Sequence, residues 1–181
     1  MKLITAIALT LPAVVQAASP SPYAGQESRQ IKAFSPSEQE DLLAGKGMGL
    51  AKAAELNGYP GPSHVLELAS QLGLTVEQVT TTRALFTSME RKAKDLGRQL
   101  IAAEQSLDTL FASKQVTPVQ LKKSLAVISD LQAKVRAAHL AAHIEQVRVL
   151  SAEQSARYAM LRGYSHGSER DEGHEHSHDH R

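Results

Sequence analysis

The longest hydrophobic pattern in the chain runs from residue 75 to residue 112. Thr75 and Gln78 form a capping-box signature at its start. Beyond this start, apolar and small residues recur in steps of three and four: Val79, Thr82, Phe86, Met89, Ala93, Leu96, Leu100, Ala103, Leu107 and Leu110. The spacing predicts one amphipathic helix of about 37 residues, roughly 55 Å long. A helix of this length needs a second long helix to cover its apolar seam.

A second pattern, from residue 117 to residue 150, supplies that partner. It opens with Thr117 as N-cap, Pro118 at the first helical position and Gln120 at the third. On a helical wheel, five apolar residues lie within about 80° of Leu121 and so share one face with it. They are Leu125, Ile128, Leu131, Val135 and Ala142. Because only about five residues connect the two patterns, we expect the helices to be antiparallel neighbours.

Shorter patterns flank this hairpin. Ser35 to Glu38 gives an N-cap, a proline and an acid that start a helix running toward Leu56. Glycine in a helix interior costs about 1 kcal/mol relative to alanine, so we expect a kink or break at Gly47-Met48-Gly49. Short helices are expected at 63–72 and 151–163. The predicted fold is all-α: a long antiparallel helical hairpin with a kinked N-terminal helix, within a single domain at residues 35–164.

The first eighteen residues are typical of a secretory signal. Lys2 precedes an apolar run, and Ala17 and Ala18 are small residues suited to cleavage after either of them. The run holds about a dozen apolar residues and contains Pro12, so it is short for a membrane span. We therefore expect export and removal of residues 1–18, with an uncleaved anchor as the alternative. Residues 19–34, rich in Ser, Pro and Gln, are expected to form a flexible arm.

Composition narrows the function. The chain has 181 residues, no cysteine and no tryptophan, and its formal net charge is +1. Without cysteine there is no disulfide or thiolate site, and without a basic excess we expect no nucleic-acid partner. The chain also has no cysteine nucleophile, and the GxSxG and HExxH strings that it contains, at 163–167 and 174–178, lie in the tail and at its margin, without the strand and helix context that these hydrolase signatures require. We do not expect an enzyme.

The sharpest chemical feature of the predicted domain is a pair of histidines, His139 and His143, on the inward face of the second long helix. Residues four apart lie about one turn apart on the same face, so the two imidazoles can converge on one metal ion. Across the hairpin, Glu90 is the closest carboxylate, and we predict a site of His139, His143 and Glu90. Glu145 points away and could contribute only across a dimer interface. The alternative is a pair of core histidines with polar partners.

The last residues give a second, independent metal signal. No apolar residue follows Tyr164, so residues 165–181 are expected to be disordered. Most of their histidines alternate with acidic or polar residues: His166, His174, His176, His178 and His180. Such a chain is expected to bind divalent transition metals, with Zn²⁺ first and Cu²⁺, Ni²⁺ or Co²⁺ as chemically similar ions. A solvated polar tail or a tag is the alternative. The scattered Met48, Met89 and Met160 are interpreted as core residues and not as copper ligands.

Two pentads, LTVEQ at 74–78 and LSAEQ at 150–154, resemble the paired LTxxQ signatures of the Spy/CpxP family of periplasmic proteins, which includes CnrX-like and ZraP-like metal sensors. The HLAAH segment at 139–143 lies just before the second pentad. The resemblance implies a periplasmic helical protein, often a homodimer, with a role in metal sensing, metal tolerance or ATP-independent chaperoning.

Together these features predict a periplasmic protein that binds or senses divalent transition metals in heavy-metal resistance or envelope stress. The alternative is a Spy-type chaperone for unfolded client proteins, with metal as a modulator. The expected partners are metal ions and a second copy of the chain, with unfolded clients or a membrane sensor or efflux component as further candidates.

Overall fold

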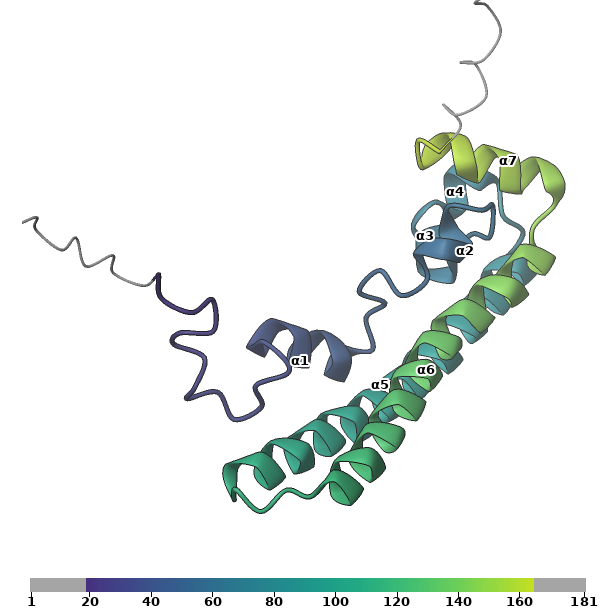
Figure 1. The fold of residues 1–181 in the computed structure, drawn as a ribbon. Coiled ribbons are helices and arrows are strands. Elements are labelled where there is room, and N and C mark those ends of the chain that lie inside the picture. Colours follow the sequence, from purple (N-terminus) through teal and green to yellow (C-terminus); the bar gives the residue numbers. More distant parts are fainter. Residues whose placement is uncertain (1–18, 165–181) are drawn as a thin grey trace, which may run out of the picture.

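The computed structural model describes residues 19–164, which within these bounds form seven helices and no strand (Figure 1). The helices are α1 (Pro36–Ala44), α2 (Lys52–Glu55), α3 (Pro62–Glu67), α4 (Ala69–Leu72), α5 (Val76–Ala112), α6 (Pro118–Val149) and α7 (Ala152–Leu161). The predicted signal segment, 1–18, and the histidine-rich tail with His166, His174, His176, His178 and His180 lie outside the described residues.

Helices α5 and α6 pack side by side as the predicted antiparallel hairpin (Figure 1). Each begins with a complete capping box, Thr75 with Gln78 and Thr117 with Gln120, in which the side chains and backbone amides satisfy one another. A short turn joins them, and Lys114 adopts a left-handed conformation there with φ of 56°. The prediction of an all-α hairpin is confirmed.

The core of the hairpin lies in its middle, where α1 crosses α5. The buried members of this cluster come from α1, α5 and α6: Leu42, Leu96, Leu100, Ile128, Leu131, Val135 and Ala138. Gly97 makes the crossing possible, because a Cβ atom at this position would run into the backbone carbonyl of Leu42. The close approach of α1 to α5 therefore depends on a glycine inside a long helix.

The break predicted in the N-terminal helix is present and begins at Gly45. This residue ends α1 in the left-handed conformation, with φ of 70°. The chain then runs through turns to α2 and on to α3, which contacts both α5 and α6. The predicted helix at 63–72 is two short helices, α3 and α4, separated at Leu68.

One residue assigned to the inward face of the second long helix is on the surface. Leu125 is 48% exposed, whereas Ile128, Leu131 and Val135 are buried. On the helical wheel Leu125 lies at one edge of the apolar face, about 40° from the origin and away from the buried side. The prediction was wrong for Leu125 because this edge of the apolar face is buried only where another segment covers the helix.

The segment before α1 is attached to α5 at its C-terminal end. Ile31 is buried, at 2% exposure, and the Lys32 ammonium lies 3.0 Å from the Asp108 carboxylate. The expected arm, 19–34, is thus anchored near Ile31. Among the described helices, none is long and apolar enough to cross a membrane.

Candidate metal centre

The two pentads meet at one end of the hairpin. The side-chain amides of Gln78 and Gln154 exchange two hydrogen bonds, of 2.8 and 3.1 Å between Nε2 and Oε1. Nε2 of Gln78 also donates to the carbonyl of Val149. Each glutamine is at the same time the third residue of a capping box, with Thr75 or Ser151 as N-cap. The pair therefore ties the starts of α5 and α7 to the end of α6.

Helices α2, α3, α4 and α7 gather around this part of the hairpin, which we call the pentad end (Figure 1). The opposite part, residues 107–121, is called the turn end. A cavity of about 730 Å³ opens at the pentad end between the hairpin and the segment 44–64. Its lining includes the two predicted histidines, His139 and His143, together with His64. It also includes the acids Glu55 and Glu90.

His139 is buried, with 5% of its surface exposed. Among residues 19–164, its Nε2 atom has no hydrogen-bond partner. The backbone of Gly47 packs against the ring, so that a Cβ atom placed there would lie 3.6 Å from Nδ1. Burial, and next the proximity of His143, lower the pKa of His139 below its ordinary value, which keeps the imidazole neutral. A buried ring nitrogen without a partner is uncommon in native proteins and calls for an explanation.

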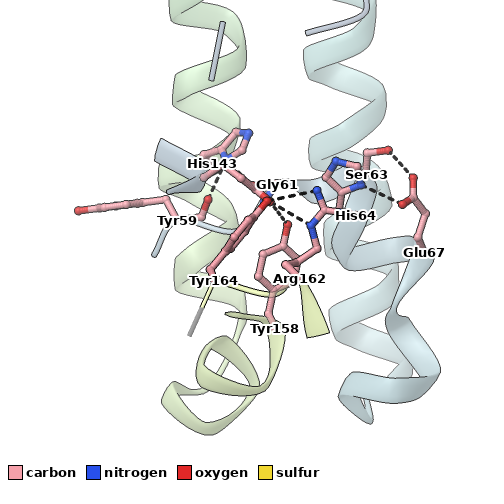
Figure 2. Close-up of polar contacts among 10 residues, drawn as sticks. Tyr59, Gly61, Ser63, His64, Glu67, His143, Tyr158, Arg162 and Tyr164 are labelled. Atoms are coloured by element: carbon pink, nitrogen blue, oxygen red, sulfur yellow. Dashed lines mark hydrogen bonds and ion pairs between the residues drawn. The ribbon is translucent and has the colours of Figure 1, made fainter. Parts of the chain in front are cut away.

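His143, one turn further along α6, is held in a defined tautomer. Its Nδ1 lies 2.7 Å from the backbone carbonyl oxygen of Tyr59 (Figure 2). A carbonyl oxygen only accepts, so Nδ1 carries a proton, and in the neutral ring Nε2 keeps its lone pair. A carboxylate oxygen of Glu55 lies 3.7 Å from the same Nδ1. Metal-binding histidines are oriented in this way, with one nitrogen donating to a carbonyl or carboxylate and the other free for the ion.

Gly61 allows the chain to pass this close to His143. A Cβ atom at this position would lie 2.9 Å from Cε1 and 3.1 Å from Nε2 of the imidazole. Either distance is too short for a stable contact, so a larger residue would displace the ring. The position of His143 therefore depends on a second glycine in the covering segment.

Glu55 is the hub of the polar contacts on this side of the cavity, although no motif or periodic signal in the sequence singled it out. One carboxylate oxygen accepts hydrogen bonds from the hydroxyls of Tyr158, at 2.5 Å, and Tyr164, at 3.0 Å. The other accepts from the backbone N–H of Gly61 at 3.2 Å. The guanidinium of Arg162 lies 3.4 Å away. Figure 2 shows Tyr158, Tyr164 and Arg162 turned toward one point beside Gly61.

Tyr158 remains a hydrogen-bond donor in this cluster. Burial and the hydrogen bond to Glu55 raise the pKa of Tyr158 far above its ordinary value, so the hydroxyl keeps its proton. Glu55 thus links α7 and the residues directly after it to the segment that covers His143.

The other predicted carboxylates have partners of their own. Glu90 lines the cavity, but its carboxylate is paired with Lys94 at 2.9 Å. Glu145 pairs with Arg148 at 2.8 Å on the outer side of α6. His64 donates to Glu67, a contact that lowers the pKa of Glu67 below its ordinary value.

Within residues 19–164, no three His, Cys, Asp or Glu side chains are grouped so that they could already hold a metal ion. The structure brings His139, His143 and Glu90 to the wall of one cavity but does not close them into a site. The predicted ligand set stays a prediction.

A family model described as heavy-metal resistance matches residues 43–157, more than half of the chain. The chain belongs to the heavy-metal resistance family. The matched region begins in α1 and ends in α7, so it contains both pentads and nearly all of the cavity lining. The resemblance to LTxxQ-type, Spy/CpxP-like proteins is thereby confirmed. Comparisons with curated proteins and with solved structures gave no match.

The cavity of this heavy-metal resistance protein has donors that suit a transition metal. Imidazole nitrogen and carboxylate oxygen are the ordinary ligands of zinc and similar divalent ions. The unpartnered Nε2 of His139 and the lone pair on Nε2 of His143 are the two donors that such an ion would use first.

Proposed function

We propose that this protein binds a divalent transition-metal ion, Zn²⁺ foremost, in the cavity at the pentad end. The observation that carries the proposal is the state of the two imidazoles on α6. His139 has a buried ring nitrogen for which residues 19–164 provide no partner, and His143 has its lone pair on Nε2. Both rings line the same cavity.

The third ligand in this proposal is Glu90, on the α5 wall of the cavity. Its carboxylate, which lies 2.9 Å from the Lys94 ammonium, must leave that partner to bind the ion. The pair is one-third exposed, and an ion pair of this kind contributes little to stability, so a metal ion can replace it at small cost. Glu55 acts as a positioning residue that, with the Tyr59 carbonyl, keeps the His143 proton on Nδ1.

Binding in this place supports a sensing role. Gly47 lies against His139 and Gly61 against His143, so both imidazoles contact the segment between α1 and α3. A metal held between α6 and α5 would fix the packing of this segment. In the proposal the exported chain works in the periplasm, where its tail histidines collect ions and the cavity reports occupancy to a second copy or to a membrane sensor or efflux component.

A chaperone role is the second candidate, and exposed apolar side chains favour it. Several such residues are 48–65% exposed at and near the turn end: Phe111, Val119, Leu125 and Val127. Exposed apolar side chains of this kind can contact unfolded clients. In this alternative, metal in the cavity only tunes the surface.

Zinc titration calorimetry on the full-length chain tests the metal site. In a variant with the five tail histidines replaced by alanine, we expect one zinc ion to remain bound. His143→Ala and His139→Ala in this background should remove that binding. Glu55→Gln should weaken it by about 10- to 100-fold, as the loss of an orienting partner does.

Glu145→Gln is the matched control, because Glu145 lies on the same helix and pairs with Arg148 outside the cavity. It should leave zinc affinity unchanged. If zinc binding disappears with the tail histidines alone, the cavity site is rejected and the chaperone role becomes the better account.

A further inference from the structure

The cavity also carries two thioether side chains that the proposed divalent site does not use. Met89 reaches it from α5 and Met48 from the segment between α1 and α2. Met160, the third methionine of the described residues, is 61% exposed on α7 and is not part of the lining, so its interpretation as a core residue was wrong.

Met48 does not behave as a core residue, so its interpretation from sequence was wrong. It is 43% exposed. Its φ of 44° lies in the left-handed region, which residues with a side chain seldom adopt. In residues 19–164 only Lys114, at the hairpin turn, shares this property among residues other than glycine. Sparsely populated backbone conformations of this kind concentrate at binding sites.

The two methionines share the cavity with an imidazole that lacks a partner. Gly47, directly before Met48, packs against the His139 ring, and no group in residues 19–164 bonds to Nε2 of that ring. Thioether sulfur is a weak hydrogen-bond acceptor but a good ligand for soft metal ions. Because the chain has no cysteine, thioethers are its only soft sulfur ligands.

We infer that Met48, Met89 and His139 form a binding site for a soft monovalent cation of the copper(I) or silver(I) class. Thioether ligands favour such soft ions, whereas imidazole together with carboxylate suits divalent zinc. The inference rests on the proposed function only in placing a metal ion in this cavity. The two donor sets share His139 and differ otherwise: the soft ion uses Met48 and Met89, and the divalent ion uses His143 and Glu90.

Silver(I) is the experimental ion, because it is soft and needs no reductant. The full-length protein is labelled with ¹³C at the methionine methyl groups and titrated with silver nitrate, and each signal is assigned from its Met→Leu variant. The signals of Met48 and Met89 should move together with the first bound ion, while that of Met160 stays in place. The tail contains no methionine, so silver held by tail histidines does not affect these signals.

Affinities then separate the two donor sets. Met48→Leu and Met89→Leu conserve volume and are expected to fold. Each should lower silver affinity by about tenfold or more, the least that loss of a supporting contact costs at metal sites. Met160→Leu is the matched control and should change nothing. Zinc affinity should be unaffected by the methionine variants, and Glu90→Gln should weaken zinc but not silver.

The inference is overturned if the Met48 and Met89 signals do not move, or if Met160 moves equally with them. Zinc binding that persists in that case would leave the proposed function intact. Conversely, selective movement of Met48 and Met89 in a cavity that fails to bind zinc would support the soft site and reject the divalent one.

Discussion

The pentad end and the turn end of the hairpin are built from the same two helices, yet equivalent positions have different surroundings. His143 and Leu125 lie about five turns apart on α6 and therefore face the same direction. The His143 side chain is only 12% exposed, whereas Leu125 is 48% exposed. The difference is the segment around Tyr59 and Gly61, which covers His143. A helical face becomes a site only where another segment covers it.

The capping glutamines repeat this contrast. Gln120 hydrogen-bonds within its own capping box at the turn end. Gln78 and Gln154 make the same local bonds and also pair with each other across the pentad end. A capping-box glutamine thus also makes a contact between helices where two helix starts lie side by side.

The largest expected effect comes from breaking that pair. Gln154→Ala removes the hydrogen bond that the side chain accepts from the Ser151 N–H and leaves the half-buried Gln78 amide short of partners, so we expect it to lower the free energy of unfolding by about 1–3 kcal/mol. Gln120→Ala removes the corresponding hydrogen bond from the Thr117 N–H at an exposed position and should cost at most about 1 kcal/mol. Urea unfolding of the two variants measures the difference. Equal losses would mean that the pair across the pentad end contributes nothing.

A smaller effect is expected for the dependence of stability on pH. It concerns the pentad end, because residues 107–121 contain no histidine. In the metal-free protein, burial lowers the pKa of His139 below its ordinary value near 6.5. The unfolded chain then takes up a proton before the folded chain does. Stability is therefore full above about pH 6.5 and falls as pH drops toward the folded pKa, by about 1.4 kcal/mol for each unit between the two pKa values.

His139→Leu should flatten this dependence. Thermal melting at about pH 5.5 and about pH 7.5, on either side of the ordinary histidine pKa, compares the variant with the parent. An unchanged loss of stability in the variant at the lower pH would assign the pH dependence to other groups.

The sequence was sufficient for the hairpin because its signals are local. Capping boxes at Thr75 and Thr117 and the three-and-four spacing after them lie in consecutive residues, and each was found in the structure as predicted. The positions of His139 and Glu90 on facing helices followed from the same periodicity. Both line one cavity.

The surroundings of the histidines depend on contacts that the sequence does not encode locally. Glu55 lies in a four-residue helix without a periodic signal, and it reaches His143 only because Gly45 ends α1 and Gly61 passes close to the imidazole. Glu90 was predicted from its place across the hairpin, but Lys94, one turn further along the same helix, takes its carboxylate. Whether the Glu90 carboxylate faces the histidines or pairs with Lys94 is decided by side-chain geometry, which the sequence pattern does not show.

The central claim is that metal acts at the pentad end, between α6 and the segment that covers it. Amide hydrogen exchange of the full-length protein with and without zinc tests it most directly, because every segment is observed in one experiment. We expect zinc to slow exchange in residues 52–62 and around His139 to Gln146, and to leave residues 107–121 unchanged. Protection confined to residues 165–181, or equal at both ends of the hairpin, would contradict the claim.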